Sequence, residues 1–155
     1  MALRAVVACR GLPMIPALTD VAGRLVYIAA PYSATTDRER GKNIARAGML
    51  CRLLTQLGAH PITVHAAIEA GHYGDDKIPA ERETGLRAVC GIARDVVRCG
   101  GLLVALTCPD GSLSAGTRRE VEAAVSAIHW GEVERVRTVS WPDLLPVLRV
   151  HGFAV

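Results

Sequence analysis

Residues 24–31 read RLVYIAAP, a short and almost wholly apolar run bounded by turn formers. An uninterrupted apolar run of this length is typical of a strand buried on both faces of a parallel sheet. Two later runs have the same character, HPITVHA at 60–66 and LLVALT at 102–107. The alternating run VERVRTV at 133–139 predicts a further strand near a sheet edge.

Segments with apolar residues at helical spacing lie between and after these runs. They predict helices over 38–57, 80–99, 117–128 and 142–150. Gly58 stands where a helix C-cap belongs, and Gly100 follows the second helix in the same way. Because strands that alternate with helices form βαβ units, the sequence predicts an α/β fold. We expect a three-layer sandwich around a parallel sheet of four to five strands.

Composition limits the class of protein. The chain has 155 residues, of which 50% are hydrophobic, and this favours a single domain. We expect an N-terminal extension over 1–23 and one α/β domain over 24–155. No apolar run is long enough for a membrane span, and we interpret the N-terminus as that of a cytoplasmic protein without a secretion signal. A net charge of +3 and 4% aromatic residues argue against a nucleic-acid partner.

The cysteines and the acidic residues give little sign of a metal or cofactor. The chain has five cysteines, an odd number, and none of them forms a CxxC pair. This predicts reduced, mostly buried thiols. His72, Asp75 and Asp76 resemble part of a metal site, but no further ligand follows at a suitable spacing, so we expect a solvated loop. We predict neither a metal nor a cofactor.

In parallel sheets ligands bind beyond the carboxyl ends of the strands, where the loops over 31–37, 64–76 and 108–120 are expected. In the third loop Ser114, Gly116 and Thr117 stand where a strand turns into a helix, so backbone N–H groups and the helix dipole favour an anion. Glu120 lies about one turn further and is expected to face the same cleft. The alternative is that Thr117 and Glu120 form a capping box.

Four motifs follow one another in a recognisable order: VYIAAPYS at 26–33, a helix that carries Asn43, PITVH at 61–65 and SAGTRREVEAA at 114–124. Together they resemble the nucleoside 2-deoxyribosyltransferase superfamily, above all its bacterial and phage relatives with YIAGPYS and SxGxxxE motifs. The resemblance implies a flavodoxin-like, doubly wound Rossmann-type sheet, chemistry on an N-glycosidic bond and a homodimer or larger assembly. The nucleophilic glutamate of that family matches Glu120.

The resemblance also assigns roles to other residues. Tyr27 matches the tyrosine of the first strand, although it could equally be core packing. Ser114 stands where enzymes of free nucleosides carry Asp and the nucleoside 5'-phosphate N-hydrolases carry Ser, so we expect a nucleotide ligand. His65 matches a histidine of that branch. The alternative is that this residue, at the end of a strand, only forms hydrogen bonds with a loop. Tyr32 and Ser33 are expected near the sugar and phosphate, unless Ser33 only begins a turn.

One position departs from that family. An acidic residue is expected about eight positions before the third strand, where this chain has Ala93, and the nearest carboxylate is Asp95. Residues two positions apart on a helix differ by a rotation of about 200°, so Asp95 would lie on nearly the opposite face from position 93. The candidates for an acid that assists the leaving base are Asp95, Asp37 and His65. Two other interpretations remain, a nucleotide-binding domain without catalysis and an interaction protein in which Glu120 only caps a helix.

Overall fold

The computed structural model describes residues 15–155, and its centre is one sheet of four parallel strands. In the order β2-β1-β3-β4 across the sheet, the strands are β2 (His60–Ile62), β1 (Leu25–Ala29), β3 (Leu102–Leu106) and β4 (Val136–Val139). Tyr27 in β1 pairs with Ile62 on one side and Leu103 on the other. The parallel sheet predicted from the apolar runs is confirmed, with four strands.

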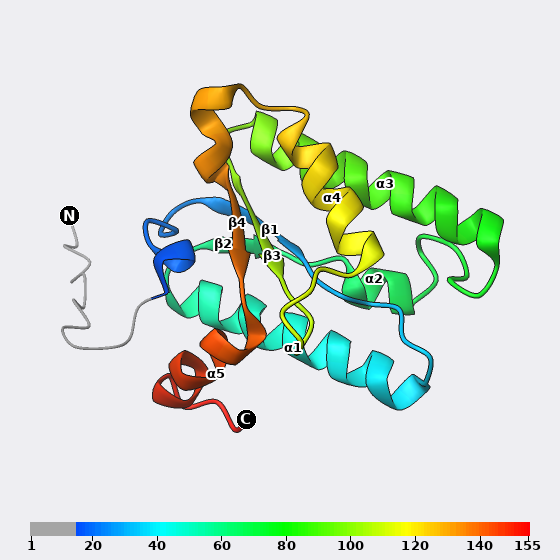
Figure 1. Cartoon of the computed structure of the whole chain (residues 1–155), viewed down its shortest axis with the longest axis horizontal. Coiled ribbons are helices and arrows are strands. Elements are labelled where there is room, and N and C mark those ends of the chain that lie inside the picture. Colours follow the sequence, from blue (N-terminus) through cyan, green and yellow to red (C-terminus); the bar gives the residue numbers. More distant parts are fainter. Residues whose placement is uncertain (1–14) are drawn as a thin grey trace, which may run out of the picture.

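Helices cover both faces of this sheet (Figure 1). The α-helices are α1 (Asp37–Gln56), α2 (His65–Glu69), α3 (Pro79–Arg98), α4 (Ala115–Val125) and α5 (Trp141–Val150), with two 3-10 helices, η1 (Pro16–Leu18) and η2 (Trp130–Arg135). Figure 1 shows α3 and α4 side by side on one face, with α1 and α5 on the other. The protein is therefore a three-layer α/β sandwich of the Rossmann or flavodoxin type, as predicted.

Strand β1 separates the two cores because successive side chains point to opposite faces of a sheet. Val26 and Ile28 are buried in the core under α1 and α5. Tyr27 and Ala29 are buried in the core that α3 and α4 cover. The tyrosine hydroxyl is thereby directed toward α4.

The strand order also locates the edge where a ligand would bind. From β1 the chain crosses to β2 on one side, and it then returns to β3 on the other side of β1. The connections that leave β1 and β3 therefore run in opposite directions, which opens a crevice at the carboxyl ends of these two strands. Pro31 to Thr36 follow β1 at this edge, and Ser114 follows β3 before α4 begins.

Several predicted boundaries differ from the structure, and three of the differences bear on the candidate site or on β4. The predicted strand over 60–66 ends at Ile62, and the short helix α2 follows, where a loop was expected. Helix α4 begins at Ala115, two residues before the expected start. The first part of the predicted strand over 133–139 belongs to η2. Helix α4 begins early because Ser114, and not Thr117, is its N-cap residue.

The last residues of the expected extension pack against the sheet. Leu18 in η1 and Val21 are buried in the core beneath α1 and α5. Arg137 of β4 donates hydrogen bonds to the carbonyl oxygens of Ala17 and Thr19, at 3.4 and 2.6 Å. Residues 1–14 of that extension lie outside the described residues.

Candidate active site

A cavity of about 210 Å³ opens at the carboxyl ends of β1 and β3. Four segments supply its walls: the loop after β1, α2 with the segment that leads to α3, one side of α3, and the first turns of α4. Of the predicted site residues, those that line it are Tyr32, Ser33, His65, Ser114, Gly116, Thr117 and Glu120. The tertiary structure thus brings together residues that lie up to 88 positions apart in the chain.

Glu120 lies at the inner end of the cavity. Its side chain comes from the second turn of α4, and only 6% of the residue is exposed. The hydroxyl of Tyr27, which is fully buried in β1, donates a short hydrogen bond to Oε2 of Glu120. Tyr27 therefore does more than fill the core, because it holds the carboxyl group in a fixed orientation.

Burial sets the acidity of this pair. Removal from water raises the pKa of Glu120 from 4.5 to about 7, and the hydrogen bond from Tyr27 only partly opposes that rise. The pKa of Tyr27 is raised far above its ordinary value by burial first and by the neighbouring Glu120 second. Tyr27 consequently stays protonated and remains a hydrogen-bond donor, while Glu120 titrates near neutral pH.

The interpretation of Glu120 as a helix cap is wrong. The N-cap residue of α4 is Ser114, whose Oγ accepts a hydrogen bond from the backbone N–H of Thr117 at 3.2 Å. Oγ of Ser114 also lies 2.8 Å from Oγ1 of Thr117. Glu120 begins the second turn of the helix, so its side chain is free of capping and bonds across the core to Tyr27.

Gly116 lies at the second position of α4, on the wall of the cavity. A Cβ atom at this position would meet only Cδ1 of Leu86, at 3.9 Å. Packing within the described protein therefore leaves room for a methyl group. If a ligand approaches the backbone here, a side chain at position 116 would collide with the ligand and not with the protein.

We therefore predict that Gly116→Ala leaves the melting temperature unchanged or slightly raised, because alanine is the better helix former by up to ~1 kcal/mol. If the cavity binds a nucleoside monophosphate, the ligand expected from the sequence, the same change should weaken that binding at least about tenfold, since the methyl group occupies space beside the helix N-terminus. Thermal unfolding and calorimetric titration measure the two effects separately. Unchanged affinity would show that no ligand atom approaches this part of α4.

His65 has a structural role in addition to lining the cavity. Its Nε2 lies 3.1 Å from the carbonyl oxygens of both Ala30 and Pro31, so that nitrogen carries the proton. Its Nδ1 lies 3.0 Å from the hydroxyl of Thr63, which then donates to it. Burial lowers the pKa of His65, so the ring is neutral. With both nitrogens engaged, His65 holds the loop after β1 and has no free proton to deliver.

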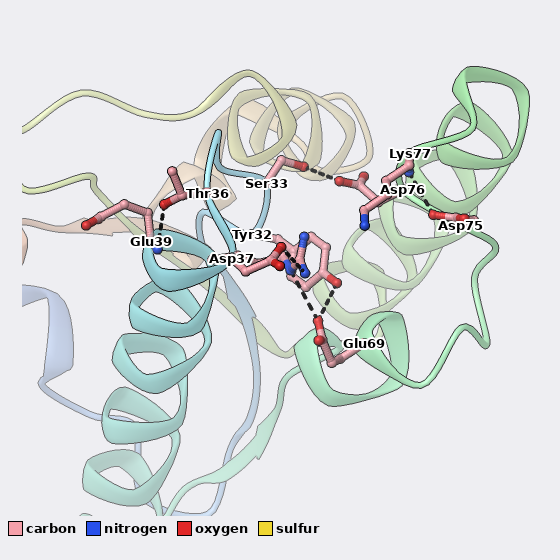
Figure 2. A network of polar contacts seen from close by, with 10 residues as sticks. Tyr32, Ser33, Thr36, Asp37, Glu39, Glu69, Asp75, Asp76 and Lys77 are labelled. Atoms are coloured by element: carbon pink, nitrogen blue, oxygen red, sulfur yellow. Dashed lines mark hydrogen bonds and ion pairs between the residues drawn. The ribbon is translucent and has the colours of Figure 1, made fainter.

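Tyr32 and Ser33 tie that loop to the opposite wall (Figure 2). The hydroxyl of Tyr32 donates to Oε2 of Glu69 at 2.7 Å, and the hydroxyl of Ser33 donates to Oδ2 of Asp76 at 2.8 Å. Burial, followed by the neighbouring Glu69, raises the pKa of Tyr32 to about 12. Both residues line the cavity, and both hydroxyls already have a protein partner.

Two of the candidate acids lie away from the cavity. The side chain of Asp95 on α3 is 67% exposed and lies 3.7 Å from Nε of Arg94. Ala93, the position where an acid was expected, is fully buried in the core. Asp37 begins α1, is 84% exposed and forms an ion pair with Arg40. Helical rotation explains the outcome, because Asp95 points to solvent when Ala93 points inward.

Among the cavity residues with polar side chains, sequence reasoning missed three, namely Asp76, Arg82 and Tyr73. Asp76 was assigned to a solvated loop, and Arg82 lies in a stretch with many charged residues. The only available signal was the position of the segment after β2, at the carboxyl end of a parallel strand. Nothing in the local pattern indicated which of its side chains would turn inward.

Three structural facts about residues 15–155 bear on the predictions about metals, membranes and cysteines. Among residues 15–155, no group of three or more His, Cys, Asp or Glu side chains is arranged to hold a metal ion. In the same residues, no helix has the length and apolar character that a membrane crossing requires. The four cysteines of this region are free thiols, but the prediction that they are mostly buried is wrong, because Cys99 is exposed and the other three are half-buried.

Fold and cavity define an α/β protein of the Rossmann type with a buried carboxyl group at the crevice between β1 and β3. The chain belongs to the family described as Domain of unknown function (DUF7768), whose model matches residues 24–129. All residues that line the cavity fall within this range. Comparisons with curated proteins and with solved structures gave no significant match.

Proposed function

We propose that the protein hydrolyses or transfers the N-glycosidic bond of a (deoxy)nucleoside 5'-monophosphate, with Glu120 as the nucleophile, and that it is related to the nucleoside 2-deoxyribosyltransferase superfamily. The observation that carries the proposal is a buried carboxyl group that faces a cavity and is oriented by a tyrosine hydroxyl. Its place on α4, one turn beyond the cavity-lining Gly116, agrees with the SxGxxxE motif.

In the proposed reaction an oxygen of ionised Glu120 attacks C1' of the sugar. The bond between C1' and the base nitrogen breaks through an oxocarbenium-like transition state, and the base leaves with the bonding electrons. The base takes up a proton from solvent water, and the water that attacks in the second step returns one proton to solvent. Water then attacks C1' of the glycosyl ester, releases the sugar phosphate and restores Glu120. In transfer, a second base takes the place of water.

Tyr27 would support the first step by keeping one carboxylate oxygen hydrogen-bonded, so that the carboxyl group cannot rotate freely. At the other end of the cavity, the first turn of α4 and its Ser114 cap would hold the phosphate. This arrangement anchors the substrate at two points and places the bond to be broken between them.

A panel of nucleoside and deoxynucleoside monophosphates tests the proposal directly. We expect release of free base from at least one of them, detected by chromatography. The test also separates hydrolysis from transfer, because added free base gives an exchanged nucleotide only in transfer. If the protein releases no base from any monophosphate, it does not have the proposed activity.

The pH dependence provides a second test. Since the nucleophile must be ionised and its pKa is about 7, we expect kcat/KM to rise from pH 5.5 to pH 8 with a midpoint near 7. Tyr27→Phe should move that midpoint to higher pH, because the lost hydrogen bond favours the ionised carboxyl. The substrate phosphate is the same in both profiles, so the difference reports on Glu120. A falling profile would make Glu120 an acid instead.

A nucleotide-binding protein without catalysis is the second candidate. The observation that favours it is the lack of a second acid on the side of α3 that lines the cavity. Leu86 and Val89 line the cavity with apolar side chains, whereas Asp95, the candidate acid on α3, does not line it. Within the described residues, Asp76 and Glu120 are the carboxylates that line the cavity. Tight binding of a monophosphate without base release would identify this function.

A further inference from the structure

The cavity has an uneven distribution of charge. Among residues 15–155, Arg82 is the one lysine or arginine that lines it, and His65, held neutral by burial, adds no charge. Two carboxyl groups, Asp76 and Glu120, line it as well. Within the lining of this cavity, an anionic ligand would therefore meet a single cationic side chain.

Arg82 is only partly engaged by the protein. Its Nε lies 3.3 Å from Oδ1 of Asp76, longer than a typical charge-assisted hydrogen bond, and half of its side chain is exposed. Within residues 15–155, its two terminal nitrogens donate to no protein acceptor. Arg119 differs, because both of its terminal nitrogens bind the carboxylate of Glu83, at 2.7 and 2.8 Å. Arg82 thus has free donors in a planar arrangement suited to phosphate oxygens.

Arg82 also lies where the proposed phosphate position opens to the surface. A neighbouring hollow of about 370 Å³ shares Asp76, Arg82, Leu86, Ala115 and Gly116 with the cavity. Lys77 and Arg119 also line this hollow, and Arg119 is paired with Glu83. The guanidinium group and the first residues of α4 therefore border the same space. A phosphate in that space would meet an arginine on one side and backbone N–H groups on the other.

We propose that Arg82 binds the phosphate of the ligand and thereby selects nucleotides over nucleosides, while Asp76 competes for Arg82 when the cavity is empty. This inference rests on the proposed function. Asp76 is placed for that competition, because it contacts Arg82 through one oxygen and accepts from Ser33 through the other. Ligand binding would exchange the carboxylate for a phosphate as the partner of the guanidinium group.

The proposal predicts effects of opposite sign for the two partners. Arg82→Ala should weaken binding of a deoxynucleoside monophosphate roughly tenfold or more and leave the matching nucleoside within about twofold. Asp76→Asn should strengthen nucleotide binding about threefold, because it removes both the competing partner and a negative charge. Arg118→Ala is the matched control, since Arg118 is exposed on α4, does not line the cavity, and loses the same charge.

Calorimetric titration of the full chain with 2'-deoxynucleoside 5'-monophosphates and the matching nucleosides tests this inference. All variants carry Glu120→Gln so that bound ligand is not consumed. A preference for nucleotides that is lost in Arg82→Ala but kept in Arg118→Ala supports the inference. A preference for nucleotides that survives Arg82→Ala overturns the inference about Arg82. Weaker nucleotide binding in Asp76→Asn overturns it as well. Either result leaves the proposed function in place. If no nucleotide or nucleoside binds, the proposed function itself is overturned.

Discussion

Replacing Glu120 by glutamine is expected to reduce base release roughly a thousandfold or more, the scale of loss seen when a covalent nucleophile is removed. Glutamine has nearly the same shape and can still accept the hydrogen bond from Tyr27, so the architecture of the cavity should be retained. Chromatographic measurement of free base, with the best monophosphate of the panel, gives the rate. Glu122→Gln is the matched control, because Glu122 is exposed on the same helix.

The same substitution should stabilise the fold at alkaline pH. The folded-state pKa of Glu120 is raised from 4.5 to about 7, so the folded protein binds its proton more tightly than the unfolded chain. The protonated carboxyl group therefore contributes about 3 kcal/mol to the free energy of unfolding. This contribution is fully present below pH 4.5 and is lost as the pH rises through 7. Glu120→Gln lacks this loss and should therefore melt higher than the wild type at pH 8.

These two readouts test different claims. Full base release by Glu120→Gln would remove the assigned nucleophile, whatever its stability. Equal melting temperatures of wild type and variant across pH 5–8 would show that Glu120 is not buried in the way described. An inactive variant with raised stability at pH 8 is the result expected of a functional carboxyl group that the fold holds at a cost.

Two glycines of α3 should respond in opposite directions to the same substitution. A Cβ at Gly85 would lie 2.3 Å from the carbonyl oxygen of Tyr73, whereas a Cβ at Gly91 would meet only the Arg94 side chain, at 3.9 Å. Gly85→Ala is therefore expected to destabilise the protein by about 1–3 kcal/mol. Gly91→Ala should stabilise it by up to ~1 kcal/mol through helix propensity.

Thermal unfolding of the two variants should give melting temperatures roughly 5–10 °C apart. The Gly85 variant should also lose affinity for nucleotides, because Tyr73 and Gly74 line the cavity and would be displaced. Gly91→Ala controls for the helix itself, since it adds the same methyl group to the same helix. Equal stability of the two variants would contradict the close approach of α3 to Tyr73.

Much of the fold was predictable from local pattern. The apolar runs at 25–30 and 102–107 correspond to β1 and β3, and the helical spacing over 38–57 and 80–99 corresponds to α1 and α3. These elements are long or strongly apolar, so the local signal agrees with the tertiary structure. Helix α2 was missed because it has only five residues, too few to show a helical period.

The candidate site was predictable only in part. The place of Glu120 after a strand-to-helix turn, together with the resemblance, was enough to single it out. The capping alternative could be rejected only from coordinates, since Ser114 and Thr117 are both good N-cap residues. Asp95 was a plausible acid by position along the chain, and its exposure became evident only once the rotation of α3 was known.

The sequence by itself determined how the four strands alternate along the chain with the four longer helices, because burial on both faces and helical periodicity are visible in consecutive residues. It also predicted that a ligand would bind beyond the carboxyl ends of the strands. Only the tertiary structure decided that the hydroxyl of Tyr27 meets the carboxyl of Glu120, 93 positions away, inside the protein. Their shifted acidity has the same origin, since desolvation depends on what covers a group in space and not on its neighbours in the chain.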